Sequence, residues 1–311
     1  MRLVFLGTPA FAVPTLERMV EAGHQVLAVV TQPDRPRGRG QHAAPPPVKQ
    51  AAARLGLAVH QPERVRHAEA VEFLRTLGAE AMVVVGYGQI IPQTVIGLAP
   101  LGIINVHASL LPKYRGAGPI QWAILNGETR TGVTTMRIDA GLDTGEILLQ
   151  AETEIGPEEN AIDLGKRLAV MGADLLVETL GGLAAGSIVP QKQDPSRATY
   201  APLLKKEDGL IDWGQPAQSI HNRVRGLQPW PGACTTFRGQ TLHIWKSSLA
   251  PGPRPLAPGR LAALRPLLVA CGSGALEVLE LQLEGRKRIS AADFANGQRL
   301  TGNDSLGEPR T

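Results

Sequence analysis

Short apolar runs and amphipathic stretches alternate through the first two thirds of the chain. The apolar runs, which are typical of buried strands, lie at Leu3–Leu6, Val26–Val30, Ala81–Val85, Leu101–His107 and Gly132–Ile138. Stretches with helical spacing, several of them followed by a glycine, lie at Ala10–Glu21, Pro46–Leu55, Ala68–Leu77, Pro119–Leu125 and Ile162–Leu183. Strands that alternate with helices are typical of a mostly parallel sheet covered on both faces, so this part is predicted to be an α/β domain with a Rossmann-like, doubly wound sheet.

The pattern changes after the polar segment Gln191–Pro202. Short β-like runs separated by turns follow it, at Thr235–Phe237, Leu242–Trp245, Leu267–Ala270 and Ala275–Leu281, with helical turns at Ala217–Arg225 and Ala291–Asn296. The expected organisation is therefore an α/β domain over residues 1–190, a linker over 191–205 and a small β-barrel domain over 206–311.

Composition indicates an ordinary globular protein. The chain has 311 residues, of which 43% are hydrophobic and 19% charged, enough for two domains with sizeable cores. No apolar run approaches the about 20 residues needed to span a bilayer, and no signal or transit peptide is visible. The two cysteines, Cys234 and Cys271, suggest no disulfide framework. A cytoplasmic protein without membrane contact is expected.

The net charge of +4 is concentrated in the second part of the chain. Residues 206–311 hold 13 Lys and Arg against 9 Asp and Glu, whereas residues 1–205 hold 19 of each. Such an excess indicates either a polyanionic partner such as nucleic acid or simply a mildly basic solvated surface.

Asn105 and His107 lie two residues apart in a predicted strand, so their side chains point to the same face. The segment Ala108–Pro119 is too rich in glycine and proline to continue the strand, which places the pair at its carboxyl end, where open α/β sheets bind ligands. Asp143, in the turn-like Gly141–Gly145, adds a carboxylate. Amine attack on a carbonyl needs donors for the oxyanion and an acceptor for the amine proton, which these three groups can supply. Each residue alone is more often structural, but together they form a candidate catalytic set for acyl transfer.

Other chemistries lack their signals in this sequence. Ser109 has no evident partner or nucleophile elbow, which favours direct transfer over an acyl-enzyme. The first turn, Gly7–Ala12, lacks the G-x-G-x-x-G pattern, so a nicotinamide oxidoreductase is disfavoured. No P-loop is present, and no His/Cys cluster has metal-ligand spacing, so no metal is expected.

The segments around the candidate set resemble the folate-dependent formyltransferases. Asn105–Pro112 and Gly141–Gly145 are similar to that family's paired signatures, and Val84–Pro92 is similar to the loop that walls its pterin pocket. The resemblance implies a 10-formyltetrahydrofolate donor, with Asn105, His107 and Asp143 as catalytic residues. It also implies a folate site formed by Ser109, Leu110, Leu111, Pro112, Gly86, Tyr87, Gly88, Ile90, Ala140 and Leu142. Gly86 before Tyr87, and Lys113-Tyr114, depart slightly from the family pattern.

An insertion at Thr31–Gly40 separates the branches of this family. Together with the residues up to Pro45 it is longer than a normal connection in an α/β unit. It resembles the loop that methionyl-tRNA formyltransferases place against the acceptor end of initiator tRNA. The resemblance implies nucleic-acid contacts by Arg35, Arg37, Arg39 and Lys49. A flexible basic loop, or a phosphate-binding turn for another substrate, remains an alternative.

The second part of the chain continues the resemblance. Tyr200–Trp213 and Arg225–Ala233 are similar to that family's second domain, which implies an OB-type barrel that adds basic surface for the tRNA backbone, with Lys206 and Arg223 as contacts. Trp213, Trp230 and Trp245 are candidates for base stacking, but core packing is the expectation.

The resemblance implies formyl transfer from 10-formyltetrahydrofolate to the α-amine of methionyl initiator tRNA. A monomer is expected. Within the family, glycinamide ribonucleotide formyltransferases should lack the basic insertion and the second domain, and a folate hydrolase domain normally belongs to a longer chain. Sugar-nucleotide N-formyltransferases are harder to separate, since some carry a similar second domain. A catalytically inactive tRNA- or folate-binding module is the alternative from another class, which the presence of all three catalytic residues disfavours.

Overall fold

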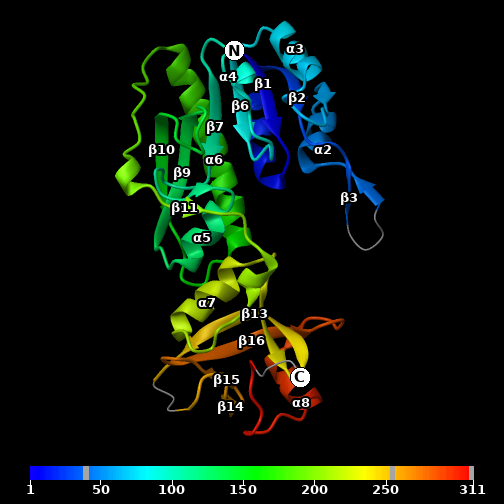
Figure 1. Cartoon of the computed structure of the whole chain (residues 1–311), viewed down its shortest axis with the longest axis vertical. Coiled ribbons are helices and arrows are strands. Elements are labelled where there is room, and N and C mark those ends of the chain that lie inside the picture. The colour runs from blue at the N-terminus through cyan, green and yellow to red at the C-terminus, as the bar shows by residue number, and fades with distance from the viewer. Residues whose placement is uncertain (38–41, 253–255, 308–311) are drawn as a thin grey trace. The chain divides into compact units, whose positions relative to one another are not determined.

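The structure is a computed structural model that describes residues 1–37, 42–252 and 256–307 (Figure 1). The chain divides into two compact units. Unit 1 comprises Met1–Pro119, Thr131–Thr153 and Gly165–Ala201, and unit 2 comprises Ile120–Arg130, Glu154–Leu164 and Pro202–Thr311. The segment expected as a linker, 191–205, is therefore shared between the two units, and its residues up to Ala201 belong to unit 1.

Unit 1 is built on a seven-stranded sheet in the order β10–β9–β7–β6–β1–β2–β5. The strands are β1 (Arg2–Gly7), β2 (Gln25–Val30), β5 (Val59–His60), β6 (Ala81–Val85), β7 (Ile103–His107), β9 (Arg130–Arg137) and β10 (Ile147–Glu154). Strands β7, β6, β1, β2 and β5 each pair in parallel with the next strand in this order, and β9 runs antiparallel to β7. The predicted Rossmann-like, mostly parallel sheet is confirmed. Edge strand β10 and the two-residue β5 are additions to the predicted elements.

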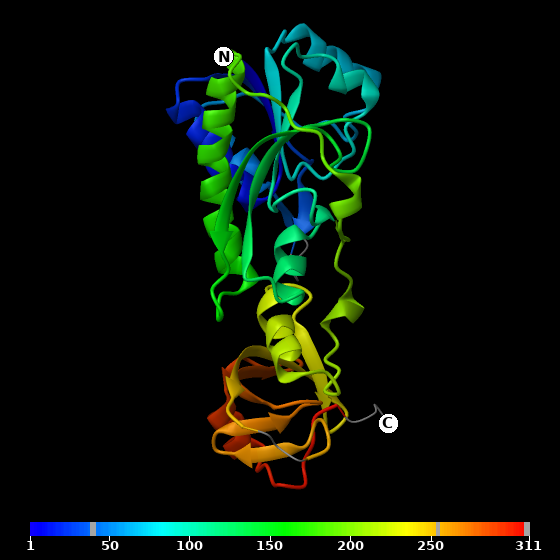
Figure 2. The same ribbon diagram turned by 90° about the vertical axis from the view of Figure 1, so that its left-hand side faces the viewer.

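Amphipathic helices cover this sheet. They are α1 (Val13–Glu21), which follows a 3-10 turn at Ala10–Ala12, α2 (Pro47–Arg54), α3 (Ala68–Thr76), the short α4 (Gln93–Ile96) and the long α6 (Ala161–Ala184). Figure 2 shows α6 lying along the sheet. A Cβ atom at Gly172 of α6 would meet Val106 at 2.7 Å and Val133 at 3.2 Å, so the glycine allows the helix to approach β7 and β9 closely. Strand β6 is buried at all of its positions, which explains its continuous apolar run.

Two small sheets accompany the main sheet of unit 1. Strand β3 (Arg35–Arg37) pairs antiparallel with β4 (His42–Ala44) in the basic insertion. Strand β8 (Arg115–Gly116) pairs in parallel with β11 (Tyr200–Ala201). The second pairing joins the segment that follows β7 to the end of the expected linker.

Unit 2 contains an antiparallel sheet with helices packed against it. Its strands run in the order β12–β13–β16–β15–β14, with β17 paired to β16. They are β12 (Ala233–Phe237), β13 (Gln240–Ala250), β14 (Leu261–Leu264), β15 (Leu267–Ala270), β16 (Ala275–Leu283) and β17 (Ile289–Ser290). The helices packed against them are α7 (Ala217–Gly226) and α8 (Ala291–Gly297), and α5 (Pro119–Leu125) lies largely in unit 2 as well. The predicted change to a second, small β domain is confirmed, and the strands of its sheet pair antiparallel.

The tryptophans of unit 2 differ in environment. Trp213 is 5% exposed, packs in the core and donates its indole N–H to Thr235 at 3.0 Å, so the expected core packing is confirmed for this residue. Trp230 is 53% exposed, so core packing is wrong for it. Trp245 stacks on His243 and lies under the guanidinium of Arg288, 4.4 Å from the ring centroid.

None of the helices in the described part of the chain is long and apolar enough to cross a bilayer.

Candidate active site

Strand β7 presents Asn105 and His107 from one face, as the two-residue spacing predicts. His107 is 6% exposed, whereas Asn105 is partly exposed. The side-chain amide of Asn105 makes no hydrogen bond to any residue that the structure describes. Its N–H groups therefore remain available to a ligand.

The hydrogen bonds of His107 assign different roles to its two ring nitrogens. Nε2 lies 2.9 Å from the main-chain oxygen of Tyr114. A carbonyl oxygen can only accept, so Nε2 carries a proton and donates it. Nδ1 lies 3.7 Å from Oδ2 of Asp143, which is longer than a hydrogen bond. Nδ1 is therefore the nitrogen that can gain or release a proton, and its N–H, when present, is open to a third oxygen.

Asp143 reaches His107 because the loop after β9 folds back. Arg137, the last residue of β9, pairs with Ile104 near the start of β7, yet the Asp143 carboxylate lies beside His107 at the end of that strand. Oδ2 of Asp143 also accepts a hydrogen bond of 2.8 Å from the main-chain N–H of Gly116. The structure thus brings Asp143 together with His107, as the sequence predicted.

The backbone of this loop adopts an unusual conformation at the carboxylate. Asp143 has φ +51°, in the left-handed region that non-glycine residues rarely occupy. Asp139 closes the preceding turn by accepting from the Gly141 N–H at 3.0 Å and from the Thr144 hydroxyl at 2.6 Å. Such conformations persist where surrounding contacts determine them, and they concentrate at functional sites.

Four residues that the sequence did not single out hold these loops. Gln193 donates its side-chain N–H groups to the carbonyl oxygens of Asp143 and Gly145, both at 2.8 Å. Its Oε1 accepts from Arg115, whose side chain is 5% exposed. The Tyr114 N–H donates to the Thr199 hydroxyl at 2.8 Å. Gly116 supplies the N–H bonded to Asp143. No local motif marks such residues, because their partners lie far away along the chain.

The predicted folate residues after β7 form a tight turn. Ser109 is fully buried and donates its hydroxyl to the main-chain oxygen of Lys113 at 2.6 Å. Leu111 is 3% exposed, its N–H donates to the Thr134 hydroxyl at 3.1 Å, and its carbonyl accepts from Gln150 at 2.9 Å. The Ser109 hydroxyl therefore shapes the turn, while Leu110 and Pro112 are partly exposed.

The predicted pterin loop lies at the point where the strand order reverses. Strand β1 lies between β2 and β6, and the loop follows β6. Such reversals create the ligand-binding crevice of open α/β sheets. Gly86 and Gly88 have φ +55° and +82°, and a Cβ at Gly86 would meet Pro9 at 2.9 Å, so glycine is required there. Ile90 is 92% exposed, as expected of a side chain that offers apolar surface. On the other predicted wall, Ala140 is exposed and Leu142 is 60% exposed.

Tyr87 contributes to this loop differently from its neighbours. Its side chain is 1% exposed and packs in the core beside β1 and β6. Burial raises the pKa of its hydroxyl to about 12, and this hydroxyl finds no partner among the described residues. The main-chain oxygen accepts from the Thr8 hydroxyl at 2.9 Å and from Gln32 at 3.2 Å. Tyr87 thus braces the loop from inside.

The predicted nucleic-acid residues of unit 1 lie in and next to the β3–β4 hairpin. Arg35 and Arg37 are on β3, and Arg39 lies outside the described residues. Lys49, on α2, donates to both carboxylate oxygens of Asp34, at 2.9 and 2.7 Å. Hydrogen bonding from Gln61, and then from Lys49, holds the pKa of Asp34 below its usual value. The Lys49 charge is therefore compensated at the base of the hairpin.

In unit 2, the predicted contacts Lys206 and Arg223 meet at a short 3-10 turn. Lys206 begins this turn, Lys206–Gly209, and is exposed. Arg223, on α7, donates to the main-chain oxygen of Asp208 in the same turn. Arg223 is thus engaged in holding the turn that presents Lys206.

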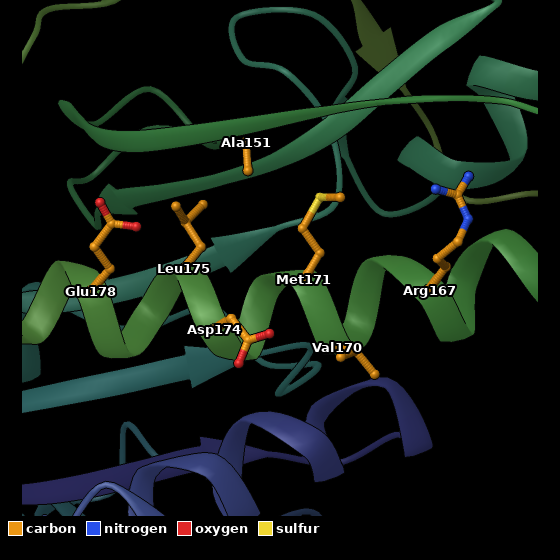
Figure 3. A pocket seen from close by; sticks show the side chains of 7 residues that line it. All are labelled: Ala151, Arg167, Val170, Met171, Asp174, Leu175 and Glu178. Atoms are coloured by element: carbon orange, nitrogen blue, oxygen red, sulfur yellow. The ribbon is translucent and has the colours of Figure 1, made fainter.

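A surface hollow of about 610 Å³ lies away from this chemistry, over α6 and β10 (Figure 3). It is lined by Ala151, Arg167, Val170, Met171, Asp174, Leu175 and Glu178. None of the candidate catalytic residues lines it. Convergent polar groups characterise a reactive site better than the size of a hollow, so the His107 region remains the candidate active site.

Both parts of the chain match known protein families. Residues 1–180 match the family described as formyl transferase, and residues 203–299 match the family described as formyl transferase, C-terminal domain. Methionyl-tRNA formyltransferase of Solibacter usitatus (strain Ellin6076) is 77% identical over 308 residues, covering 99% of this chain and 99% of the relative. Methionyl-tRNA formyltransferase of Koribacter versatilis (strain Ellin345) is 57% identical over 312 residues, again covering 99% of each.

A solved structure shows the same fold at low sequence identity. The N-formyltransferase from Helicobacter canadensis, in complex with folinic acid and dTDP-3-aminofucose, has a TM-score of 0.64 and 20% identity, covering 89% of this chain and 98% of that one. The likeness concerns the fold, whereas the full-length identities above concern the family.

Proposed function

This chain belongs to the formyl transferase family, and we propose that it transfers the formyl group of 10-formyltetrahydrofolate to the α-amine of methionyl initiator tRNA. The observation that carries the proposal is the 77% identity to a methionyl-tRNA formyltransferase over nearly the whole of both chains. The arrangement of Asn105, His107 and Asp143 supplies the groups that the reaction needs. The chain is thus an enzyme of translation initiation.

The donor's formyl carbon sits beside Asn105 and His107. When the α-amine attacks this carbon, a C–N bond forms and negative charge develops on the formyl oxygen. The free amide of Asn105 and the Nδ1–H of charged His107 donate to that oxygen. Because Nε2 already donates to Tyr114, the ring is held with Nδ1 facing the reaction. The 3.7 Å gap between Nδ1 and Asp143 leaves this N–H free for the oxyanion.

Asp143 acts as the general base in the same step. The attacking nitrogen becomes positively charged, and the Asp143 carboxylate accepts its proton. The tetrahedral intermediate then collapses: the bond from the formyl carbon to N10 of the folate breaks, and N10 takes up the proton. The products are tetrahydrofolate and N-formylmethionyl-tRNA. No covalent enzyme intermediate is needed, in keeping with the buried Ser109 hydroxyl, which is engaged by Lys113.

The loops around the site suit a flat aromatic donor. Ile90 and Leu142 expose apolar side chains on the two predicted walls, and these give surface on which a pterin ring packs. Gly86, Gly88, Leu110, Leu111, Pro112 and Ala140 complete the proposed folate site. Ser109 and Tyr87 contribute to the proposed folate site indirectly. Ser109 stabilises the turn after β7, and Tyr87 stabilises the loop after β6.

The basic residues have a proposed role in tRNA recognition. Residues 1–190 form the proposed catalytic domain, 191–205 a connecting segment and 206–311 an OB-like tRNA-binding domain. Arg35, Arg37 and Arg39 of the insertion and Lys206 of the second domain supply charge for the phosphate backbone. Lys49 and Arg223 act next to them, through Asp34 and the Lys206–Gly209 turn. The enzyme acts as a monomer in the cytoplasm, which light scattering and fractionation test.

Transfer of labelled formyl from 10-formyltetrahydrofolate to methionyl initiator tRNA tests the function. Methionyl elongator tRNA and an amino-sugar nucleotide serve as parallel acceptors. Selective formylation of the initiator is the expected result. Formylation of the amino sugar alone would retain the catalytic chemistry and overturn the assignment of the acceptor.

A further inference from the structure

The last residues of unit 1 contact both the loop after β7, which supports His107, and the loop after β9, which carries Asp143. Residues 191–201, referred to here as the strap, contain a 3-10 turn at Pro195–Arg197 and strand β11. The strap contacts the loop after β7 through Arg115 N–H to Thr199 O at 2.8 Å and Gly118 N–H to Ala201 O at 3.1 Å. It contacts the loop after β9 through Gln193. One segment therefore touches the supports of both His107 and Asp143.

We propose that Gln193 and Thr199 are positioning residues for formyl transfer, which fix Asp143 and His107 relative to each other through the backbone of the two loops. This rests on the proposed function for the identity of the reaction. Neither residue touches the reacting atoms. Each acts on a main-chain group whose conformation decides where a catalytic side chain points.

Gln193 fixes the backbone conformation of the loop that carries Asp143. Its two N–H groups bond the carbonyl oxygens of Asp143 and Gly145, which fixes the peptides that follow Asp143 and Gly145. Arg115 donates to Oε1 from Nε at 3.1 Å and from Nη2 at 2.7 Å. A guanidinium has only donors, so the amide cannot turn over without setting its own N–H groups against them. The buried Arg115 thereby locks the donors of Gln193 towards the loop.

Thr199 holds Tyr114, the residue whose carbonyl binds His107. Its hydroxyl accepts from the Tyr114 N–H at 2.8 Å, and the Tyr114 carbonyl accepts from His107 Nε2 at 2.9 Å. Tyr114 has φ +62°, so it shares with Asp143 the left-handed conformation that is rare for non-glycine residues. This conformation is unfavourable for a side-chain-bearing residue, so contacts from the surrounding structure must hold it. The strap supplies one such contact to each of the two residues.

Kinetic analysis of the full-length enzyme tests the proposal with Gln193→Glu and Thr199→Val. Gln193→Glu keeps the side-chain length and a partner for Arg115 but sets an oxygen against the carbonyls of Asp143 and Gly145. Thr199→Val keeps the shape and removes the hydroxyl acceptor. We expect kcat to fall about 10- to 100-fold in each, since misplacement near 1 Å has effects of this size, with KM for both substrates within about threefold.

Two further variants separate positioning from general damage. Thr199→Ser restores the hydroxyl and should recover most of kcat. Ser196→Ala removes a hydroxyl of the same strap that, among the described residues, bonds only Asp194. It should keep kcat within about twofold of wild type, because this hydroxyl contacts neither catalytic loop. A kcat near wild type in both Gln193→Glu and Thr199→Val, or an equal loss in Ser196→Ala, would overturn the proposal.

A measurement that needs no substrate distinguishes this proposal from the proposed function. In protein labelled with ¹⁵N-histidine, His107→Gln identifies the ring signals of His107. Gln193→Glu should shift Nδ1, which faces Asp143, and Thr199→Val should shift Nε2, which donates to Tyr114, while Ser196→Ala leaves both in place. If wild type formylates no methionyl-tRNA but these shifts occur, the reaction is misassigned and the positioning role of Gln193 and Thr199 is supported. If wild type is active and the His107 signals do not move in the variants, the positioning role of Gln193 and Thr199 is refuted.

Discussion

His107 Nδ1 and Asp143 Oδ2 lie 3.7 Å apart, close enough to interact electrostatically and too far apart for a direct hydrogen bond. Each group is fixed by another contact: His107 by the Tyr114 carbonyl and Asp143 by the Gly116 N–H. In the proposed mechanism the two groups are thereby held in place to bond different substrate atoms, the imidazole the formyl oxygen and the carboxylate the attacking amine. Preorganised groups of this kind avoid reorganisation during the reaction.

Asp143→Asn should separate the charge of this carboxylate from its structural role. The amide oxygen of asparagine can still accept from the Gly116 N–H, so the loop should keep its conformation. The negative charge that accepts the amine proton is lost, and kcat should fall about 10²- to 10⁴-fold. Steady-state kinetics and thermal unfolding check this, and turnover near the wild-type rate would remove Asp143 from the mechanism.

Asn105→Ala should abolish most turnover without weakening the fold. The amide makes no hydrogen bond to the described residues, so its removal orphans no protein group. Loss of one oxyanion donor lowers kcat by about 10²- to 10³-fold in comparable sites. The melting temperature should stay within the error of wild type. An active Asn105→Ala enzyme would contradict the assignment of this residue.

Tyr87→Phe should leave folate binding and turnover unchanged. The ring packs in the core, and its hydroxyl is buried without a partner among the described residues, so removing the hydroxyl should be neutral or stabilising. The KM for 10-formyltetrahydrofolate checks the first point. A rise of tenfold or more would show that the hydroxyl contacts the folate after all.

The same variant gives a prediction on pH. The pKa of Tyr87 is raised from 10.0 to about 12 in the folded protein, so the folded state keeps a proton that the unfolded state loses. The contribution of Tyr87 to stability is therefore complete below pH 10 and decreases as pH rises towards 12. Comparison of urea unfolding at pH 9 and at roughly pH 11 should show a steeper loss of stability for wild type than for Tyr87→Phe. Parallel losses in the two proteins would contradict the raised pKa.

Asp34→Asn distinguishes two roles for Lys49. If Lys49 contacted tRNA phosphates directly, removing its carboxylate partner would free a cation and lower KM for tRNA. If the ion pair instead supports the base of the β3–β4 hairpin, KM for tRNA should rise, by about two- to fivefold for an exposed pair. We expect the rise, with KM for the folate unchanged. Arg37→Ala with Arg39→Ala is the comparison, because it removes charge from the insertion and leaves both Asp34 and Lys49 in the sequence.

A large part of the fold is predictable from local patterns. The run Ala81–Val85 is apolar throughout and forms β6 over those same residues. Pro119–Leu125 and Leu267–Ala270 likewise form an element with the predicted bounds. Strand β10 escaped prediction because it lies at the sheet edge, where exposed and covered residues alternate and polar residues interrupt the apolar pattern. In unit 2 the sequence did not reveal that Trp230 is exposed while Trp213 is buried, because burial depends on which elements pack together.

The sequence by itself determined the alternating elements, the shared face of Asn105 and His107, and the family resemblance that names Asp143, since these depend on residues close together in the chain. Only the tertiary structure decided which nitrogen of His107 faces Asp143, that Lys49 is paired with Asp34, and that Gln193 and Thr199 support the catalytic loops. The physical reason is that a hydrogen bond depends on distance and direction in space. Gln193 reaches Asp143 across a separation of 50 residues, for which the local sequence pattern carries no signal.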